Sequence, residues 1–90
     1  MEFELTEVVG ADTETNGLDT NNSKAFCIGF CNTKGQTLFL DFRSDPTAIS
    51  QAQKIFDNCE AIFHNAKFDI KMLENTGVYV RRFHDTYTIS

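Results

Sequence analysis

A short apolar segment near the start of the chain, Val8 to Ala11, runs directly into two carboxylates, Asp12 and Glu14. The Asn16-Gly17 pair that follows is a strong turn signal, so the segment is predicted to be a strand that ends in a loop. Side chains alternate along a strand, so both carboxylates point to one face and the residue between them points to the other. Two carboxylates on one face repel each other unless a cation lies between them. The segment therefore predicts a buried strand that leads into a divalent-metal site.

Apolar runs of strand length recur along the rest of the chain. We expect strands over residues 7–12, 25–32, 36–42, 60–64 and 79–83. The short turn at 33–35 separates two of these runs, which is typical of a hairpin. The two strands on either side of this turn are therefore predicted to pair antiparallel.

Two segments carry helical signals. The first helix is predicted over 46–57, with Asp45 as its N-cap and a proline in its first position. Its apolar residues recur at helical spacing, and we expect all of them to face the core: Ile49, Ala52, Ile55 and Phe56. The second helix is predicted over 66–75, with Asn65 as its N-cap.

The predicted order of elements, β-β-β-α-β-α-β, favours an α/β fold with a mixed sheet. Ninety residues form one small domain, over 1–90, and a hydrophobic fraction of 41% supports a globular core. Helices placed between the later strands act as crossover connections, which parallel neighbours require. Asp12 would then lie at the end of a central strand, where such sheets bind their ligands.

The charge balance is acidic, with 8 Lys and Arg against 13 Asp and Glu. This balance argues against a protein that coats nucleic acid non-specifically, because such proteins present a basic face. It is compatible with a metal-dependent nuclease, whose cations bind the phosphate. We find no signal peptide and no apolar run of membrane-spanning length, and we expect an intracellular protein, cytoplasmic or associated with the nucleoid, that is neither secreted nor in a membrane.

The three cysteines, Cys27, Cys31 and Cys59, form no pattern typical of a zinc site. An odd number without a secretion signal indicates reduced thiols. Cys27 and Cys31 share one face of a predicted strand, and we expect both to pack in the core.

A second acidic segment, His64-Asn65-Ala66-Lys67-Phe68-Asp69, follows another apolar strand. Phosphodiester hydrolysis by two metals needs carboxylates that hold two cations about 3.5–4 Å apart. We assign Asp12 to bridge both cations, Glu14 to the cation that activates water, and Asp69 to the second cation. The alternatives are a solvated strand end for the first two residues and, for Asp69, an acid stabilised by the helix dipole. We interpret His64 as structural, with a base near the phosphate as its alternative role.

Three segments, 12–19, 64–73 and 83–86, match a known family in order and spacing. The first two resemble the first and second motifs of the DEDD superfamily of 3'-5' exonucleases, and the third resembles the strand that follows. The chain is most similar to the proofreading domain of family A DNA polymerases. This resemblance implies a ribonuclease H-like fold, two Mg²⁺ or Mn²⁺ ions, and removal of nucleotides from the 3' ends of single-stranded DNA, with RNA as the alternative substrate.

The resemblance also implies roles for individual residues. Leu18 matches a residue that packs against the terminal base, and Asn65 matches one that contacts the terminal nucleotide. We assign Thr13 and Phe68, which lie within the two motifs, to substrate binding as well. Asp85 matches a recurrent acid that is not a metal ligand, and we interpret it as a supporting residue behind the site.

The third motif of this family, Tyr-x-x-x-Asp or His-x-x-x-x-Asp on a later helix, does not follow the second motif in this chain. In the family it supplies a fourth carboxylate and the group that orients the water. We therefore expect a C-terminally truncated exonuclease domain, which would work with the missing part or with a polymerase module. One alternative is a catalytically incomplete fragment that binds a metal or a partner. A weaker alternative is a haloacid dehalogenase-like phosphatase, although its second Asp would stand where Glu14 stands.

Overall fold

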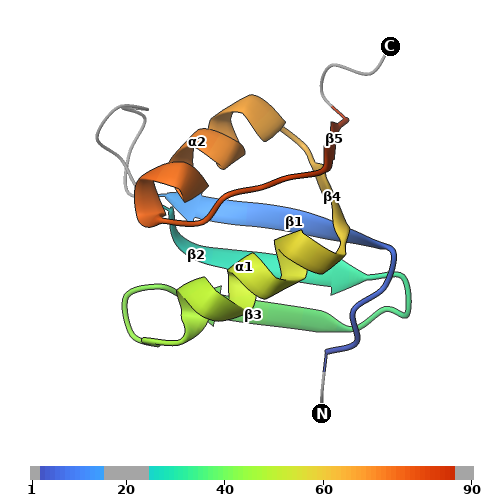
Figure 1. Ribbon diagram of the computed structural model, residues 1–90, viewed down its shortest axis with the longest axis horizontal. Helices are drawn as coiled ribbons and strands as arrows, with labels where there is room; N and C mark the ends of the chain where they lie inside the picture. The colour runs from blue at the N-terminus through green and yellow to red at the C-terminus, as the bar shows by residue number, and fades with distance from the viewer. Residues whose placement is uncertain (1–2, 16–24, 87–90) are drawn as a thin grey trace.

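The computed structural model describes residues 3–15 and 25–86. Seven elements follow one another in this part of the chain (Figure 1): β1 (Val8–Thr15), β2 (Ala25–Asn32), β3 (Thr37–Asp41), α1 (Ala48–Asn58), β4 (Glu60–Phe63), α2 (Ala66–Thr76) and β5 (Phe83–Asp85). The predicted order of strands and helices is confirmed. Neither helix is long and apolar enough to cross a membrane.

The strands form one mixed sheet in the order β3-β2-β1-β4-β5, with β1 at its centre. β2 pairs antiparallel with β1 and with β3, and the hairpin predicted around residues 33–35 is confirmed. β4 pairs parallel with β1 and with β5. The parallel pairs follow from the connections, because α1 and α2 carry the chain back to the same end of the sheet before each new strand begins.

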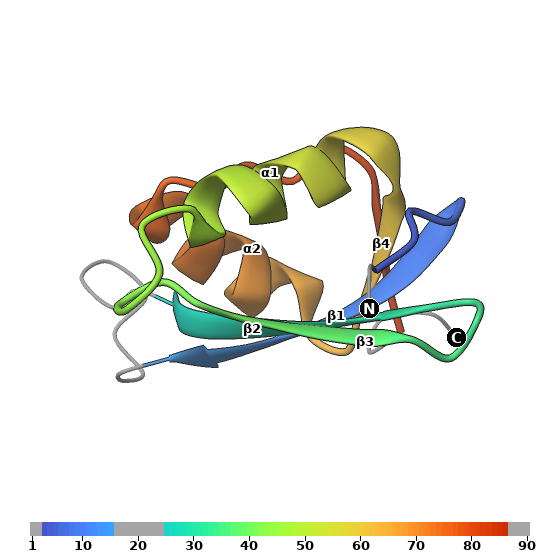
Figure 2. The same ribbon diagram turned by 90° about the horizontal axis from the view of Figure 1, so that it is seen from below.

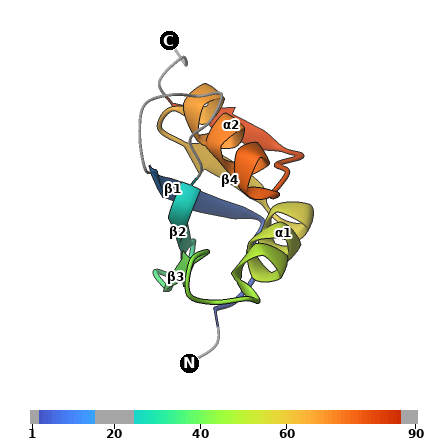
Figure 3. The same ribbon diagram turned by 90° about the vertical axis from the view of Figure 1, so that its left-hand side faces the viewer.

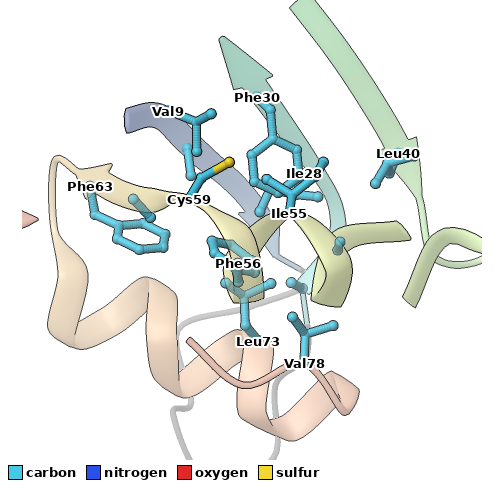
Figure 4. Packing of buried hydrophobic residues seen from close by; sticks show 14 of the residues in the cluster. Val9, Ile28, Phe30, Leu40, Ile55, Phe56, Cys59, Phe63, Leu73 and Val78 are labelled. Carbon is cyan, nitrogen blue, oxygen red and sulfur yellow. The ribbon is translucent and has the colours of Figure 1, made fainter. Parts of the chain in front are cut away.

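Both helices lie on the same face of the sheet, and the other face is left uncovered by the described elements (Figures 2 and 3). The core fills the layer between sheet and helices, and Figure 4 shows its side chains meeting there. Phe56 of α1 is the central residue of this layer. It packs edge-to-face on Phe30 of β2, with ring centroids 5.2 Å apart, and stacks on Phe63 of β4 at 6.0 Å. Aromatic packing of this kind joins α1 to strands on both sides of β1.

The first helix begins at Ala48, later than predicted. Its start is delayed because the Asp45 carboxylate accepts hydrogen bonds from the backbone N–H and the hydroxyl of Thr47, at 2.8 and 2.7 Å, which holds a turn in front of the helix. The prediction for Ile49 was wrong, since this side chain is 39% exposed and Ala48 takes the core position instead. The other three residues of the predicted apolar stripe are buried.

The last strand also differs from the prediction, because it covers Phe83–Asp85 and not 79–83. The segment before it is held against α1 by polar contacts. The Gln53 side chain exchanges two hydrogen bonds of 2.8 Å with the backbone of Tyr79, and Arg81 pairs with Asp57 at 2.8 Å. The two Gln53 bonds satisfy backbone groups of Tyr79 that a strand would have paired within the sheet. Pairing with β4 begins only at Phe83.

Candidate metal centre

Asp12 and Glu14 lie in the second half of the central strand, as part of one element that continues to Thr15 and therefore past the predicted end at residue 12. β1 pairs with β4 only over Val8–Gly10, and it then continues beside β2 alone among the described elements. Val9 and Ala11 are buried under the helices, whereas Asp12 and Glu14 are exposed. Because side chains alternate along a strand, both carboxylates point to the uncovered face of the sheet.

Asp69 approaches the same strand from the helical layer. It lies in the first turn of α2 and is only 8% exposed. The hydroxyl of Thr13 donates a hydrogen bond of 2.8 Å to its Oδ1 atom. Thr13 sits between Asp12 and Glu14 and points to the helix side, so this bond ties the strand of the first acidic segment to the helix of the second. The two segments are thereby brought together at one end of β1.

The surroundings of Asp69 disfavour its ionised form. Burial raises the pKa of Asp69, and the negative charges of Asp12 and Asp85 raise it further. The Thr13 hydrogen bond and the charge of His64 act in the opposite direction. A carboxylate whose pKa is raised by neighbouring negative charges is stabilised in its ionised form when a cation binds nearby.

The donor set of this centre fits a hard divalent cation, but it is not a complete cage. Asp12, Glu14 and Asp69 offer carboxylate oxygens, which Mg²⁺ and Mn²⁺ prefer. Among the residues that the structure describes, no group of three or more His, Cys, Asp or Glu side chains lies close enough together to hold a metal ion. Magnesium sites often use only one or two carboxylates and complete their shell with water and substrate phosphate. The described residues are therefore suited to an open site of this type.

Three of the residues expected to bind substrate or support the site lie around one hollow of about 690 Å³ beside α2: Asn65, Phe68 and Asp85. Asn65 occupies the N-cap position of α2, but its side chain makes no capping hydrogen bond, so the predicted capping bond is absent. Phe68 and Asp85 are half-buried. Thr13 is engaged with Asp69, on the other side of β1 from the exposed carboxylates. Leu18 lies outside the described residues.

A second hollow, of about 510 Å³, opens on the uncovered face of the sheet. Asp12 and His64 both line it, together with the exposed ring of Phe39. The sequence favours a structural role for His64, and the structure places this exposed side chain beside the candidate centre, with its Nδ1 atom 3.4 Å from the hydroxyl oxygen of Thr86. The sequence signal for this placement is that His64 directly follows an apolar strand, because ligands bind at the ends of parallel strands.

The cysteines divide in a way that the sequence did not indicate. Cys27 is buried, as expected, and Cys59 is buried as well, but Cys31 is exposed, so its predicted burial was wrong. Cys31 faces the side of the sheet that neither described helix covers. Cys27 lies opposite Glu14 in the β1–β2 ladder, and its Sγ atom is 3.6 Å from Glu14 Oε2. Only the strand register reveals this contact.

We expect Asp69→Asn to raise the midpoint of thermal unfolding at pH 7 in the absence of divalent metal. Because burial raises the pKa of Asp69, the folded protein binds this proton more tightly than the unfolded chain does. Stability is therefore lost as the pH rises from about 3.9 through the folded-state pKa. At pH 7 the raised pKa of the buried carboxyl costs the wild type stability, whereas the amide carries no such cost and still accepts the Thr13 hydrogen bond.

Thermal unfolding of both proteins at pH 7 and at about pH 3 checks this, since the difference should vanish where both residues are neutral. Asp45→Asn is the matched control with the opposite sign. Hydrogen bonds from Thr47 lower the pKa of Asp45, so its ionised form stabilises the fold and its replacement should lower the midpoint at pH 7. An unfolding midpoint of Asp69→Asn below that of the wild type at pH 7 would contradict the conclusion that the ionised Asp69 carboxylate destabilises the fold.

Solved structures share this fold. Brucella melitensis NrnC superimposes with a TM-score of 0.68 over 89% of this chain and 40% of that one, at 20% identity. A nuclease in its apo form gives a TM-score of 0.70 over 91% of this chain and 41% of that one, at 22% identity. Brucella melitensis NrnC bound to pGG superimposes with a TM-score of 0.69 over 89% of this chain and 41% of that one, at 20% identity. The fold is therefore the expected ribonuclease H-like α/β fold.

Sequence comparisons identify the family. The DNA polymerase DpoZ of Salmonella phage PMBT28 is 36% identical over 74 residues, which cover 80% of this chain. The match spans 12% of that polymerase. The model of the 3'-5' exonuclease domain of A-type DNA polymerases matches residues 1–90. The chain therefore belongs to the 3'-5' exonuclease family of A-type DNA polymerases.

Proposed function

We propose that this chain is the exonuclease part of a DNA polymerase and that it removes nucleotides from the 3' ends of single-stranded DNA. The observation that carries the proposal is the Thr13–Asp69 hydrogen bond, which brings the two acidic segments together at the end of the central strand. The raised pKa of Asp69, to which the charge of Asp12 contributes, supports a site built for cations.

Asp12, Glu14 and Asp69 are the residues that would hold Mg²⁺ or Mn²⁺. Two such ions, when bound, activate a water for attack and stabilise the leaving oxygen of the phosphodiester. Asp12 is assigned to both ions because it lies on the central strand and its charge reaches Asp69. Thr13 orients the Asp69 carboxylate through its hydroxyl. Asp85 acts on Asp69 by its charge and is assigned a supporting role.

The substrate would lie along the hollow beside α2. Phe68 offers an aromatic ring for stacking, which holds a single strand without selecting its bases. The Asn65 side chain makes no capping bond and is assigned to the terminal nucleotide. Leu18 keeps its expected role against the terminal base, although it lies outside the described residues. NrnC has been solved with pGG bound, which supports a nucleic acid substrate and keeps RNA ends as the second candidate.

The relatives are longer than this chain, which spans 12% of the phage polymerase and about 40% of the structural neighbours. We propose that it works beside a polymerase module in DNA replication, and thus in the cytoplasm or at the nucleoid. A catalytically incomplete metal-binding or partner-binding fragment is the second candidate, because three ligands do not converge among the described residues. The family match removes the basis for the phosphatase alternative.

Incubation of the purified chain with 5'-labelled single-stranded DNA in Mn²⁺ tests the proposal. We expect a ladder of products that shorten stepwise from the 3' end, and we expect a 3'-phosphate block or removal of Mn²⁺ with a chelator to stop it. An RNA strand of the same sequence, assayed in parallel, compares the two substrates. A folded chain that leaves both strands intact would favour the incomplete fragment, and Mn²⁺ binding would then separate a metal-binding role from a partner-binding one.

A further inference from the structure

Cys27 contacts one of the candidate metal ligands from the neighbouring strand. In the antiparallel ladder it lies directly opposite Glu14, and its Sγ atom is 3.6 Å from Glu14 Oε2. The thiol is buried, with 3% of the residue exposed, whereas Glu14 is exposed. A rigid, buried group therefore holds one oxygen of a side chain that otherwise extends into solvent.

The chemistry of the pair fixes the direction of the bond. An ionised carboxylate can only accept a hydrogen bond, and a neutral thiol has one hydrogen to donate. A cysteine thiol keeps its proton at neutral pH unless its surroundings favour the anion, and a neighbouring carboxylate does the opposite. Cys27 therefore donates to Glu14.

In the β1–β2 register, few side chains of β2 could hold a carboxylate of β1 in place. Asp12 lies opposite Gly29, which has no side chain, and Gly10 lies opposite Cys31. Cys27 is thus the β2 side chain placed across from a carboxylate of the first acidic segment. A glutamate side chain has three rotatable torsions and loses rotamer entropy when it is ordered. A hydrogen bond formed before a cation arrives removes part of that cost from binding.

We propose that Cys27 is a positioning residue, whose S–H group holds the Glu14 carboxylate in place for the metal site. The inference rests on the proposed role of Glu14 as a metal ligand. The Cys27–Glu14 pair resembles the Thr13–Asp69 pair, in which a hydroxyl on one element donates a hydrogen bond to a carboxylate on another. Hydrogen bonds that orient metal ligands typically change metal affinity by about 10–100-fold, and a weak thiol donor belongs at the lower end.

The test compares Cys27→Ala and Cys27→Ser in the full chain. We expect Cys27→Ala to weaken Mn²⁺ binding by about tenfold, and Cys27→Ser to restore it because a hydroxyl donates as well. Cys59→Ala is the control for loss of a buried thiol, since Cys59 is fully buried in the core between sheet and helices, and it should leave Mn²⁺ affinity unchanged. Mn²⁺ affinity is measured by electron paramagnetic resonance of the free ion, and thermal unfolding confirms that each variant is folded.

A second measurement does not depend on metal. The S–H stretching band that Cys27→Ser removes from the Raman spectrum belongs to Cys27, and Glu14→Gln should shift this band because a weaker acceptor replaces the carboxylate. The proposal is overturned if the band does not respond, or if Cys27→Ala binds Mn²⁺ as tightly as the wild type does. Either of these two results would leave the proposed metal site unaffected. A wild-type chain that binds no Mn²⁺ overturns the proposed function together with this role.

Discussion

Asp12→Asn is expected to slow the removal of 3'-terminal nucleotides by about three orders of magnitude. The amide preserves the shape of the side chain but removes the charge that would neutralise the cations. Metal ions in such sites contribute several kcal/mol of charge stabilisation, and each 1.36 kcal/mol corresponds to about a tenfold change in rate. Single-turnover degradation of 5'-labelled single-stranded DNA in Mn²⁺ measures the effect directly.

Glu7→Gln is the matched control for this substitution. Glu7 is exposed just before β1, and its carbonyl oxygen, which the substitution keeps, accepts the backbone hydrogen bond from Glu60. This variant changes the net charge by the same amount and should keep the wild-type rate. Equal rates for Asp12→Asn and the wild type would remove Asp12 from the site. Equal losses in both variants would show that net charge, and not the position of the carboxylate, controls the reaction.

Phe56→Ala is expected to lower the free energy of unfolding by about 3–5 kcal/mol. Phe56 is fully buried, and its ring contacts aromatic rings of β2 and β4. Removing it leaves a cavity where α1 meets the sheet, because neighbours in a close-packed core relax only partly. Small domains are stable by about 5–15 kcal/mol in total, so this loss is a large share of it. Urea denaturation followed by circular dichroism measures the change.

Phe39→Ala removes the same ring from the opposite side of the sheet. Phe39 is 65% exposed, so its loss should change the free energy of unfolding by about 0.5 kcal/mol or less. The comparison separates burial from residue type. A similar loss in both variants would mean that the uncovered face is buried in solution, by a second copy or by another part of the protein.

The parts of the site that lie close together in sequence could be predicted. Asp12 and Glu14 share a face because a strand alternates every two residues, and this rule needs no knowledge of the rest of the fold. Asp69 was placed in the first turn of a helix by the Asn65 boundary before it. The order of elements followed from the same local periodicities.

Contacts between distant segments could not be predicted in the same way. Cys27 meets Glu14 only because β2 pairs with β1 in one particular register, and no local pattern specifies that register across the intervening segment. Ile49 fits a helical stripe, yet the orientation of α1 on the sheet leaves it 39% exposed. The segment before β5 fits a strand pattern, but its backbone at Tyr79 forms hydrogen bonds with Gln53 of α1 instead.

Local sequence patterns specify the chemistry available to this protein: a pair of carboxylates on one strand, a third at a helix start, and an α/β order of elements. These features depend on residues a few positions apart, where backbone geometry alone decides which side chains share a face. Which carboxylate is destabilised in its ionised form, and how the acids are held, depends instead on packing between elements. Asp69 is buried and accepts the Thr13 hydrogen bond only because α2 packs on the central strand, and this burial raises its pKa. Burial and long-range hydrogen bonds arise between elements and not within them.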